Sequence, residues 1–476
     1  MNKSISHGAI SDNLFDANQH VDKPDSNDCH GRDTGFRRLA ERFRLPDLPI
    51  EFFSDYDGVG EAGFFRMGSD AVCFGHCKQE TTRSLSEMTP DVIHLISQTG
   101  NVVHLPFSAD EVVDNLLLER YVRKQQGMTA QSQLRLLYYM LRPILPVHIR
   151  KYLQRISLVG WKSISFPRWP VDFSVDRIFE KLIILAMRSM GVNQLPFIWF
   201  WPGTMQSCAI MTHDVEELAG LNFCTELMDM NDTRGIKSSF QLIPEARYSV
   251  SQSFLDSVRA RGFEIAVHDL HHDAKLFRSE IDFLQRIVAV NRYGKIFKTS
   301  GFRSGALYRN QQWYEHLDFQ YDMSVPNVAH LEPQRGGCCT VFPYFVGKTL
   351  ELPLTITQDY AILYFLNDNS IDLWFHQIEM IRREYGLISI LVHPDYLITT
   401  HSKDNYLKLL CYLDDLRTNQ QLWIATPAEL NSWWRLRNSM KLEMHYGAWK
   451  ICGQGSERAR VAFANLEDGK LSYLVQ

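Results

Sequence analysis

Between residues 196 and 440, short apolar runs alternate with segments that have apolar residues at helical spacing. The runs that predict strands are 208–211, 239–243, 263–267, 299–302, 319–324, 350–354, 387–392 and 421–425. The segments that predict helices between them include 253–261, 278–292, 372–384 and 405–417. Repeated strand–helix units favour parallel strands with helices wound outside them, because right-handed crossover connections dominate. The pattern therefore predicts a (β/α) barrel, in which functional residues lie at the carboxyl ends of the strands.

The chain before the predicted barrel changes pattern twice. Residues 1–45 are mostly polar and predict a mobile tail whose end could form one or two helical turns. Residues 46–110 contain short alternating runs and predict a small β-rich module. Residues 111–195 return to helical spacing and predict a helical region, which includes a helix over 175–190. Its basic amphipathic stretch, 148–156, suits a solvated face or contact with an anionic membrane.

The remaining 441–476 segment again alternates in short runs and predicts a small β appendage. A length of 476 residues exceeds one compact core, which agrees with several domains. The net charge of -5 gives no reason to expect a nucleic-acid partner. Residues 1–22 lack the basic start and apolar stretch of a secretory signal, and no run has the roughly 18 apolar residues of a membrane helix. We therefore expect a cytoplasmic protein, with contact at the inner membrane surface left open.

Two polar clusters each follow an apolar run at the exit of a predicted strand. They read Thr-His-Asp-Val-Glu at 212–216 and His-Asp-Leu-His-His-Asp at 268–273. Strand ends can converge at one end of a barrel, so the clusters together offer two imidazoles, His268 and His272, and a carboxylate to one divalent metal. Nine scattered cysteines lack paired CxxC spacing and are expected to be buried thiols rather than zinc ligands.

Three further motifs follow the two polar clusters along the chain. They are Gly301-Phe302-Arg303, Tyr321-Asp322-x-Ser324 and Leu391-Val392-His393-Pro394. Together with the two clusters and Ser238-Ser239-Phe240, this order over residues 205–435 resembles the polysaccharide deacetylase (NodB-like carbohydrate esterase) family. The resemblance implies a distorted (β/α)7 barrel and metal-dependent removal of acetyl groups from N-acetylated sugars.

The resemblance also implies a metal site. Glu216 would be the carboxylate ligand, and His268 and His272 would be the paired histidine ligands. The ion would be zinc, with cobalt, nickel or manganese as alternatives. Most family members have two adjacent aspartates where this chain has Asp-Val-Glu, so the resemblance leaves open that Asp214 is the ligand instead.

Proton transfer is implied for four further residues. Asp214 would be the general base, held in place by Arg303. His393, oriented by Asp322, would be the general acid. The motif that begins at Arg303 departs from the family pattern, because it lacks a proline and has Tyr308 one place late, and an unusual substrate is therefore possible.

These motifs lead to three hypotheses about the function. The first hypothesis is a hydrolase that deacetylates a bacterial cell-surface saccharide or its precursor, with an N-acetylated saccharide as its partner. The second keeps the barrel but acts on a non-sugar amide. The third is an inactive barrel that binds a glycan or a partner protein. Metal analysis separates the third from the others, and the sequence does not indicate an oligomeric state.

Overall fold

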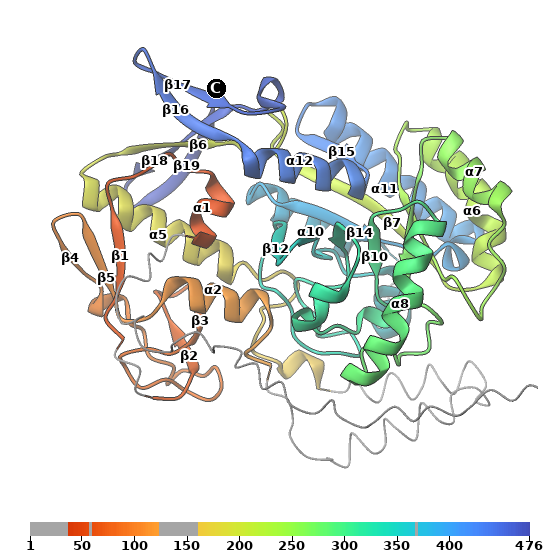
Figure 1. Ribbon diagram of the computed structural model, residues 1–476, viewed down its shortest axis with the longest axis horizontal. Coiled ribbons are helices and arrows are strands. Elements are labelled where there is room, and N and C mark those ends of the chain that lie inside the picture. The colour runs from red at the N-terminus through yellow and green to blue at the C-terminus, as the bar shows by residue number, and fades with distance from the viewer. Residues whose placement is uncertain (1–36, 57–59, 123–159, 367–369) are drawn as a thin grey trace, which may run out of the picture.

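The structure is a computed structural model that describes residues 37–56, 60–122, 160–366 and 370–476 (Figure 1). Most of the predicted tail and the basic stretch 148–156 lie outside the described residues. Among the described helices, none combines the length and the apolar composition that a membrane-crossing segment requires.

A mainly parallel sheet organises residues 207–425. Its strands are β7 (Ser207–Val215), β8 (Ser239–Leu242), β9 (Glu264–His268), β10 (Gly301–Arg303), β11 (Tyr321–Asp322), β12 (Tyr344–Val346), β13 (Thr349–Glu351), β14 (Leu387–Leu391) and β15 (Leu422–Ala425). Their order is β12-β13-β11-β10-β9-β8-β7-β14, with β15 also paired to β7, and only β12 runs antiparallel to its neighbour. Each predicted apolar run overlaps one of these strands.

The sheet curls on itself. The backbone N–H of Ile356, in the segment after β13, donates to the carbonyl of Ser389 in β14 at 3.2 Å. This contact brings the segment after β13 against β14, which lies at the other end of the strand order. The helices around the sheet are α6 (Leu218–Asp232), α7 (Gln252–Ala260), α8 (Glu280–Ile296), α10 (Asp372–Arg383), α11 (Thr400–Thr418) and α12 (Pro427–Ser439) (Figure 1). The fold is therefore mixed α/β with a curled sheet, as the pattern predicts.

The curled sheet is irregular between β10 and β11. Two 3-10 segments, Gly305–Leu307 and Gln311–His316, connect these strands where a regular unit would have an α-helix. After β13 the chain enters the short α9 (Asp359–Ala361) and a π-helical turn, Ile362–Leu366. These connections carry residues of the site described below.

Hydroxyl side chains set where several helices begin. Ser251, Ser279, Thr399 and Thr426 each accept a hydrogen bond from a backbone N–H in the first turn of the helix that follows. Such caps satisfy donors that have no partner within the helix. The helix starts thus follow from residues that the sequence shows directly.

Among its described residues, the N-terminal region contains two small sheets and several helices. One sheet has the strand order β1 (Glu51–Ser54), β5 (Val102–Leu105), β4 (Ser97–Thr99). The other is the pair β2 (Gly63–Arg66) and β3 (Val72–Gly75). The helices include α2 (Ala109–Leu117) and α5 (Ser174–Met190). One continuous cluster of buried apolar residues extends from this region into the curled sheet, so the two share a core.

The carboxyl-terminal strands pair with a strand that precedes the curled sheet. β6 (Gln194–Ile198) pairs antiparallel with β18 (Val461–Glu467), which pairs with β19 (Lys470–Val475). A separate hairpin is formed by β16 (Lys441–His445) and β17 (Ala448–Cys452).

The short helix α1 (Arg37–Phe43) lies at this junction. Its Arg42 forms a buried ion pair with Asp176 of α5 at 2.8 Å, and Arg437 of α12 donates to the carbonyl of Arg42. The end of the predicted tail therefore forms a short packed helix, in keeping with the one or two helical turns expected there.

Candidate active site

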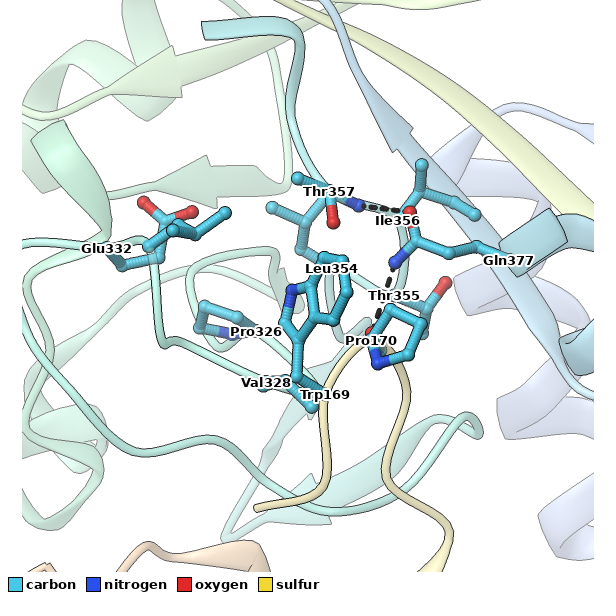
Figure 2. Close-up of a pocket in the computed structure, with 11 residues that line it drawn as sticks. Trp169, Pro170, Pro326, Val328, Glu332, Leu354, Thr355, Ile356, Thr357 and Gln377 are labelled. Atoms are coloured by element: carbon cyan, nitrogen blue, oxygen red, sulfur yellow. Dashed lines mark hydrogen bonds between the residues drawn. The ribbon is translucent and has the colours of Figure 1, made fainter. Parts of the chain in front are cut away.

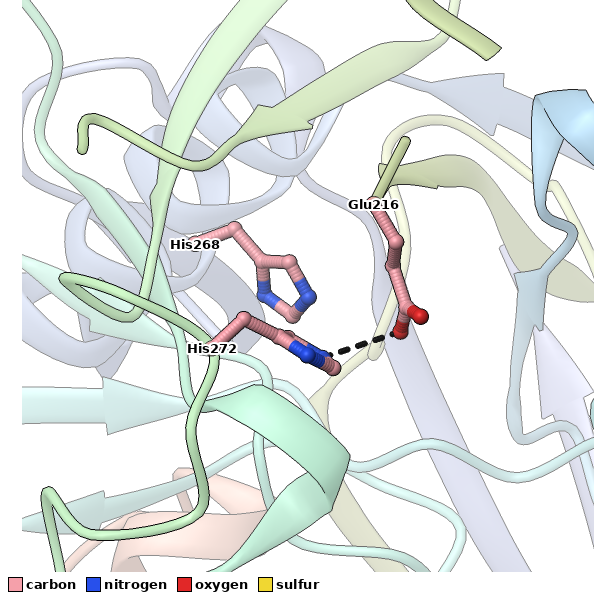
Figure 3. Close-up of side chains that lie close together, drawn as sticks. All are labelled: Glu216, His268 and His272. Carbon is pink, nitrogen blue, oxygen red and sulfur yellow. Dashed lines mark ion pairs between the residues drawn. The ribbon is translucent and has the colours of Figure 1, made fainter. Parts of the chain in front are cut away.

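Three potential metal ligands converge at the carboxyl ends of β7 and β9. One ligand atom each from Glu216, His268 and His272 lies within 4.8 Å of the others (Figure 3). Glu216 directly follows β7, His268 ends β9, and His272 lies in the loop after it. The Nε2 atom of His272 is 2.9 Å from Oε1 of Glu216.

The ligand atoms are suited to a cation. Nε2 of His268 and both ring nitrogens of His272 are buried and lack a hydrogen-bond partner with acceptable geometry. Buried polar atoms without partners are rare in folded proteins, because each one costs free energy. A divalent ion bound to Nε2 of His268, to one ring nitrogen of His272 and to Glu216 would give two of these three nitrogens a partner. Two imidazoles with one carboxylate form a set that binds zinc. The residues present therefore fit such an ion.

Backbone contacts fix both histidines. Nδ1 of His268 lies 3.2 Å from the carbonyl of Arg303, and a proton donated there leaves Nε2 free to bind a metal. His272 has a φ of 52°, and its carbonyl accepts a hydrogen bond from Arg247. Gly305 lies beneath it, where a Cβ atom would be 2.9 Å from Cδ2 of His272. Only glycine allows this close approach.

Asp214 lies beside the ligands and is held by Arg303. Its Oδ1 accepts from NH1 of Arg303 at 2.8 Å, and its Oδ2 is 3.6 Å from Nε2 of His268. Burial alone would raise the pKa of Asp214, but the charges of Arg303, His268 and His393 hold this pKa below its ordinary value. The structure thus places Arg303 directly against Asp214.

His393 is paired with Asp359. Its Nδ1 is 2.7 Å from Oδ1 of Asp359, and its backbone N–H donates to Oδ2 at 2.8 Å. Its Nε2 faces the potential metal ligands, 3.5 Å from Oε1 of Glu216. Burial would lower the pKa of His393, but Asp359 and Glu216 raise it well above its ordinary value. Both carboxylates therefore favour the protonated form of His393.

The expectation that Asp322 orients His393 is wrong. The carboxylate of Asp322 accepts hydrogen bonds from the hydroxyl of Tyr314 at 2.7 Å and from the hydroxyl and backbone N–H of Ser324 at 2.7 and 3.1 Å. These contacts hold Asp322 within the segment around β11, whereas Nδ1 of His393 contacts Asp359. The sequence does contain a signal for Asp359, because this acidic residue closely follows the strand run 350–354.

A side-chain bridge supports the segment that leads to Asp359. The side chain of Gln377 in α10 accepts from the backbone N–H of Thr357 and donates to the carbonyl of Pro170, both at 3.1 Å (Figure 2). The adjoining cavity, lined by Trp169 and Glu332 among others, encloses only about 20 Å³. It has room for a water molecule but not for a sugar. Gln377 thus links Pro170, which precedes α5, to Thr357, two residues before Asp359.

Aromatic rings lie beside His393. The rings of Tyr360 and Tyr396 are nearly parallel, with an interplanar angle of 18° and a centroid separation of 6.3 Å. The ring of Tyr396 is 5.1 Å from that of His393. Both tyrosines are partly exposed, so they border the approach to the proposed proton donor.

Comparisons with known proteins give structural likenesses only. No protein-family model and no curated protein matches the chain. Two of the similar solved structures are described as polysaccharide deacetylases. The one from Mycobacterium smegmatis has 16% identity, a TM-score of 0.41, and coverage of 52% of this chain and 96% of its own. The one from Pseudomonas aeruginosa has 14% identity, a TM-score of 0.38, and coverage of 49% and 93%.

A third similar structure is the Puue allantoinase, with 14% identity, a TM-score of 0.40, and coverage of 49% of this chain and 92% of its own. Polysaccharide deacetylases are thus among the solved structures that this chain resembles, at low identity.

Proposed function

We propose that the chain is a metal-dependent hydrolase with a barrel of the distorted (β/α)7 type, which removes the acetyl group from an N-acetylated saccharide. One observation carries the proposal. The unpartnered nitrogens of His268 and His272, together with Glu216, lie between a buried carboxylate, Asp214, and a buried imidazole, His393. Amide hydrolysis needs a metal ion, a general base and a general acid side by side, since an amide is a poor electrophile and has a poor leaving group.

Glu216, His268 and His272 would hold the ion, with zinc as the first choice. When bound, a divalent ion polarises the amide carbonyl and makes water a better nucleophile near neutral pH. Asp214 would accept the proton from the attacking water through Oδ2, the oxygen on the ligand side. Its other oxygen is bound to Arg303, which fixes the carboxylate in place.

His393 would complete the reaction as the proton donor. The amine leaves only after its nitrogen gains a proton, and Nε2 of His393 faces the same space as Glu216. Asp359 holds the opposite ring nitrogen and thereby fixes the orientation of the ring. Asp214 would thus take a proton from the attacking water, and His393 would give a proton to the departing amine.

The aromatic pair supports a saccharide substrate. Tyr360 and Tyr396 offer partly exposed rings next to His393, and the apolar face of a pyranose ring packs on such surfaces. A cell-surface polysaccharide of bacteria or its precursor is the substrate class that we propose.

The test is acetate release from a panel of N-acetylated sugars by zinc-loaded protein. His268→Ala and Asp214→Asn should abolish release. His271→Ala is the matched control, because this histidine pairs with Glu245 at the protein surface at 2.9 Å and should leave release unchanged. Full activity of His268→Ala, or absence of bound metal in active wild-type protein, would refute the proposal. Turnover of a simple amide without release from any sugar would favour a non-sugar substrate.

A further inference from the structure

The β16–β17 hairpin gathers three potential metal ligands on one face. Glu443 and His445 are two residues apart in β16 and therefore point to the same side of the strand. Cys452 of β17 is paired with Lys441, which is two residues before Glu443 and shares that side. Figure 1 shows the hairpin projecting from the molecule near the carboxyl terminus.

The distances between the three side chains suit a tetrahedral ion. Nε2 of His445 is 3.4 Å from an oxygen of Glu443 and 3.8 Å from Sγ of Cys452, and one ligand atom of each residue lies within 4.8 Å of the others. Tetrahedral zinc with ordinary bond lengths separates nitrogen from oxygen by about 3.3 Å and nitrogen from sulfur by about 3.6 Å. Small side-chain adjustments would therefore bring all three atoms to bonding distance.

We propose that Glu443, His445 and Cys452 form a second metal site, specific for zinc or a similar ion and separate from the proposed catalytic centre. Thiolate and imidazole ligands select zinc over magnesium or calcium. Cys452 would bind as a thiolate, so binding releases its thiol proton to the solvent. Water would occupy the fourth position, because Glu443 and His445 are 49% and 44% exposed.

The local structure gives such a site a physical role. A two-stranded hairpin with little buried surface is only marginally stable. Both ligand-bearing strands have mostly exposed or partly exposed residues, and only Leu442 and Ile451 are buried. An ion bound by residues of both strands would cross-link them and hold the hairpin in register.

Cobalt distinguishes the two sites, because a Co²⁺–thiolate bond produces a near-ultraviolet charge-transfer band. The catalytic set of Glu216, His268 and His272 contains no sulfur and cannot give this band. Reduced, metal-free protein without a histidine tag should develop the band on titration with Co²⁺. His268→Ala should retain it, and Cys452→Ser should lose it.

Cys411→Ser is the matched control, since Cys411 is the other partly exposed cysteine among those the structure describes. It should retain the band.

Zinc stoichiometry gives an independent measurement. Wild-type protein should bind two equivalents, and Cys452→Ser and His268→Ala should each bind one. Cys452→Ser should also retain acetate release, which separates this site from catalysis. Zinc should slow hydrogen exchange of the β16–β17 amides in wild-type protein but not in Cys452→Ser. Absence of the cobalt band in wild-type protein, or its persistence in Cys452→Ser, would overturn the inference.

Discussion

Replacing Asp359 by Asn tests whether this residue orients the proton donor. The carboxylate of Asp359 accepts two hydrogen bonds from His393, from Nδ1 at 2.7 Å and from the backbone N–H at 2.8 Å. Asparagine has nearly the same shape but only one acceptor oxygen and no charge. It can satisfy the backbone donor or the ring donor, but not both, so the ring loses its fixed orientation or its charged partner.

The expected loss follows from this contact. A buried hydrogen bond to a charged group contributes about 1.5–3 kcal/mol. If that free energy is lost in the transition state, kcat for an amide falls roughly 10- to 150-fold. KM should change little, because Asp359 is buried behind His393 and is not placed to bind the sugar.

The assay compares two leaving groups. Acetate release from an N-acetylated sugar requires a proton on the departing nitrogen, whereas 4-nitrophenyl acetate expels a stable anion without one. Asp359→Asn should therefore lower kcat for the sugar but lower hydrolysis of the aryl ester by less than about threefold. Asp322→Asn is the comparison, since Asp322 contacts Tyr314 and Ser324 rather than His393. Equal losses on both substrates, or a sugar-selective loss in Asp322→Asn, would refute the assigned role of Asp359.

Three further changes test how the site and the core are held. Arg437→Met removes a buried guanidinium that donates to three backbone carbonyls, so the free energy of unfolding in urea should fall by about 3 kcal/mol; an unchanged value contradicts the role of these bonds. Gly305→Ala places a Cβ atom 2.6 Å from Oδ2 of Asp269 and 2.9 Å from Cδ2 of His272. Zinc affinity in a competition titration should fall at least about tenfold, with the circular dichroism unchanged. Burial lowers the pKa of His213 from 6.5 to about 3, so its stabilising contribution is complete above pH 6.5 and is lost as pH falls. When the pH falls from 6.5 to about 5, the free energy of unfolding should drop by about 2 kcal/mol more in wild-type protein than in His213→Asn. Equal drops in the two proteins would exclude His213 as the cause.

The sequence predicts the strands of the curled sheet and the convergence of the candidate ligands because both depend on local patterns. Each strand except β12 coincides with a predicted apolar run, and the polar residues at 212–216, His268, Arg303 and His393 directly follow such runs. Parallel strands present their carboxyl ends at one edge, so His268 and Arg303 become neighbours across β9 and β10 without further information. For the same reason the contact between Arg303 and Asp214 could be expected.

The pairing of Asp359 with His393 could not be predicted in the same way. Asp359 lies in an irregular segment after β13, and its contact with His393 depends on how that segment returns to β14. Asp322 matches the motif order equally well, but its oxygens are occupied by donors of its own loop. Two carboxylates at strand ends are equivalent in a sequence until the loop conformations are known.

The order of α1 depends on contacts far along the chain. Arg38 pairs with Asp114, and Arg42 pairs with Asp176, so the residues that hold the helix lie more than 70 positions away. Taken alone, α1 is a short and highly charged segment next to a polar stretch, which is typical of a tail. A local pattern contains no information on such ion pairs.

The N-terminal region supports the irregular loops of the site. Glu119, just after α2, accepts hydrogen bonds from the buried guanidinium of Arg309 and, at 2.6 Å, from the backbone N–H of Gly337. Arg309 lies between β10 and β11, where 3-10 turns replace a packed helix, and Gly337 lies in the long connection after β11. Gln377 makes a comparable link between Pro170 and the segment that leads to Asp359. These loops lack the helical packing that stabilises regular barrel units, so the polar contacts from the N-terminal region take over that function. The described part of the N-terminal region therefore contacts the loops around the proposed site through Glu119 and Pro170.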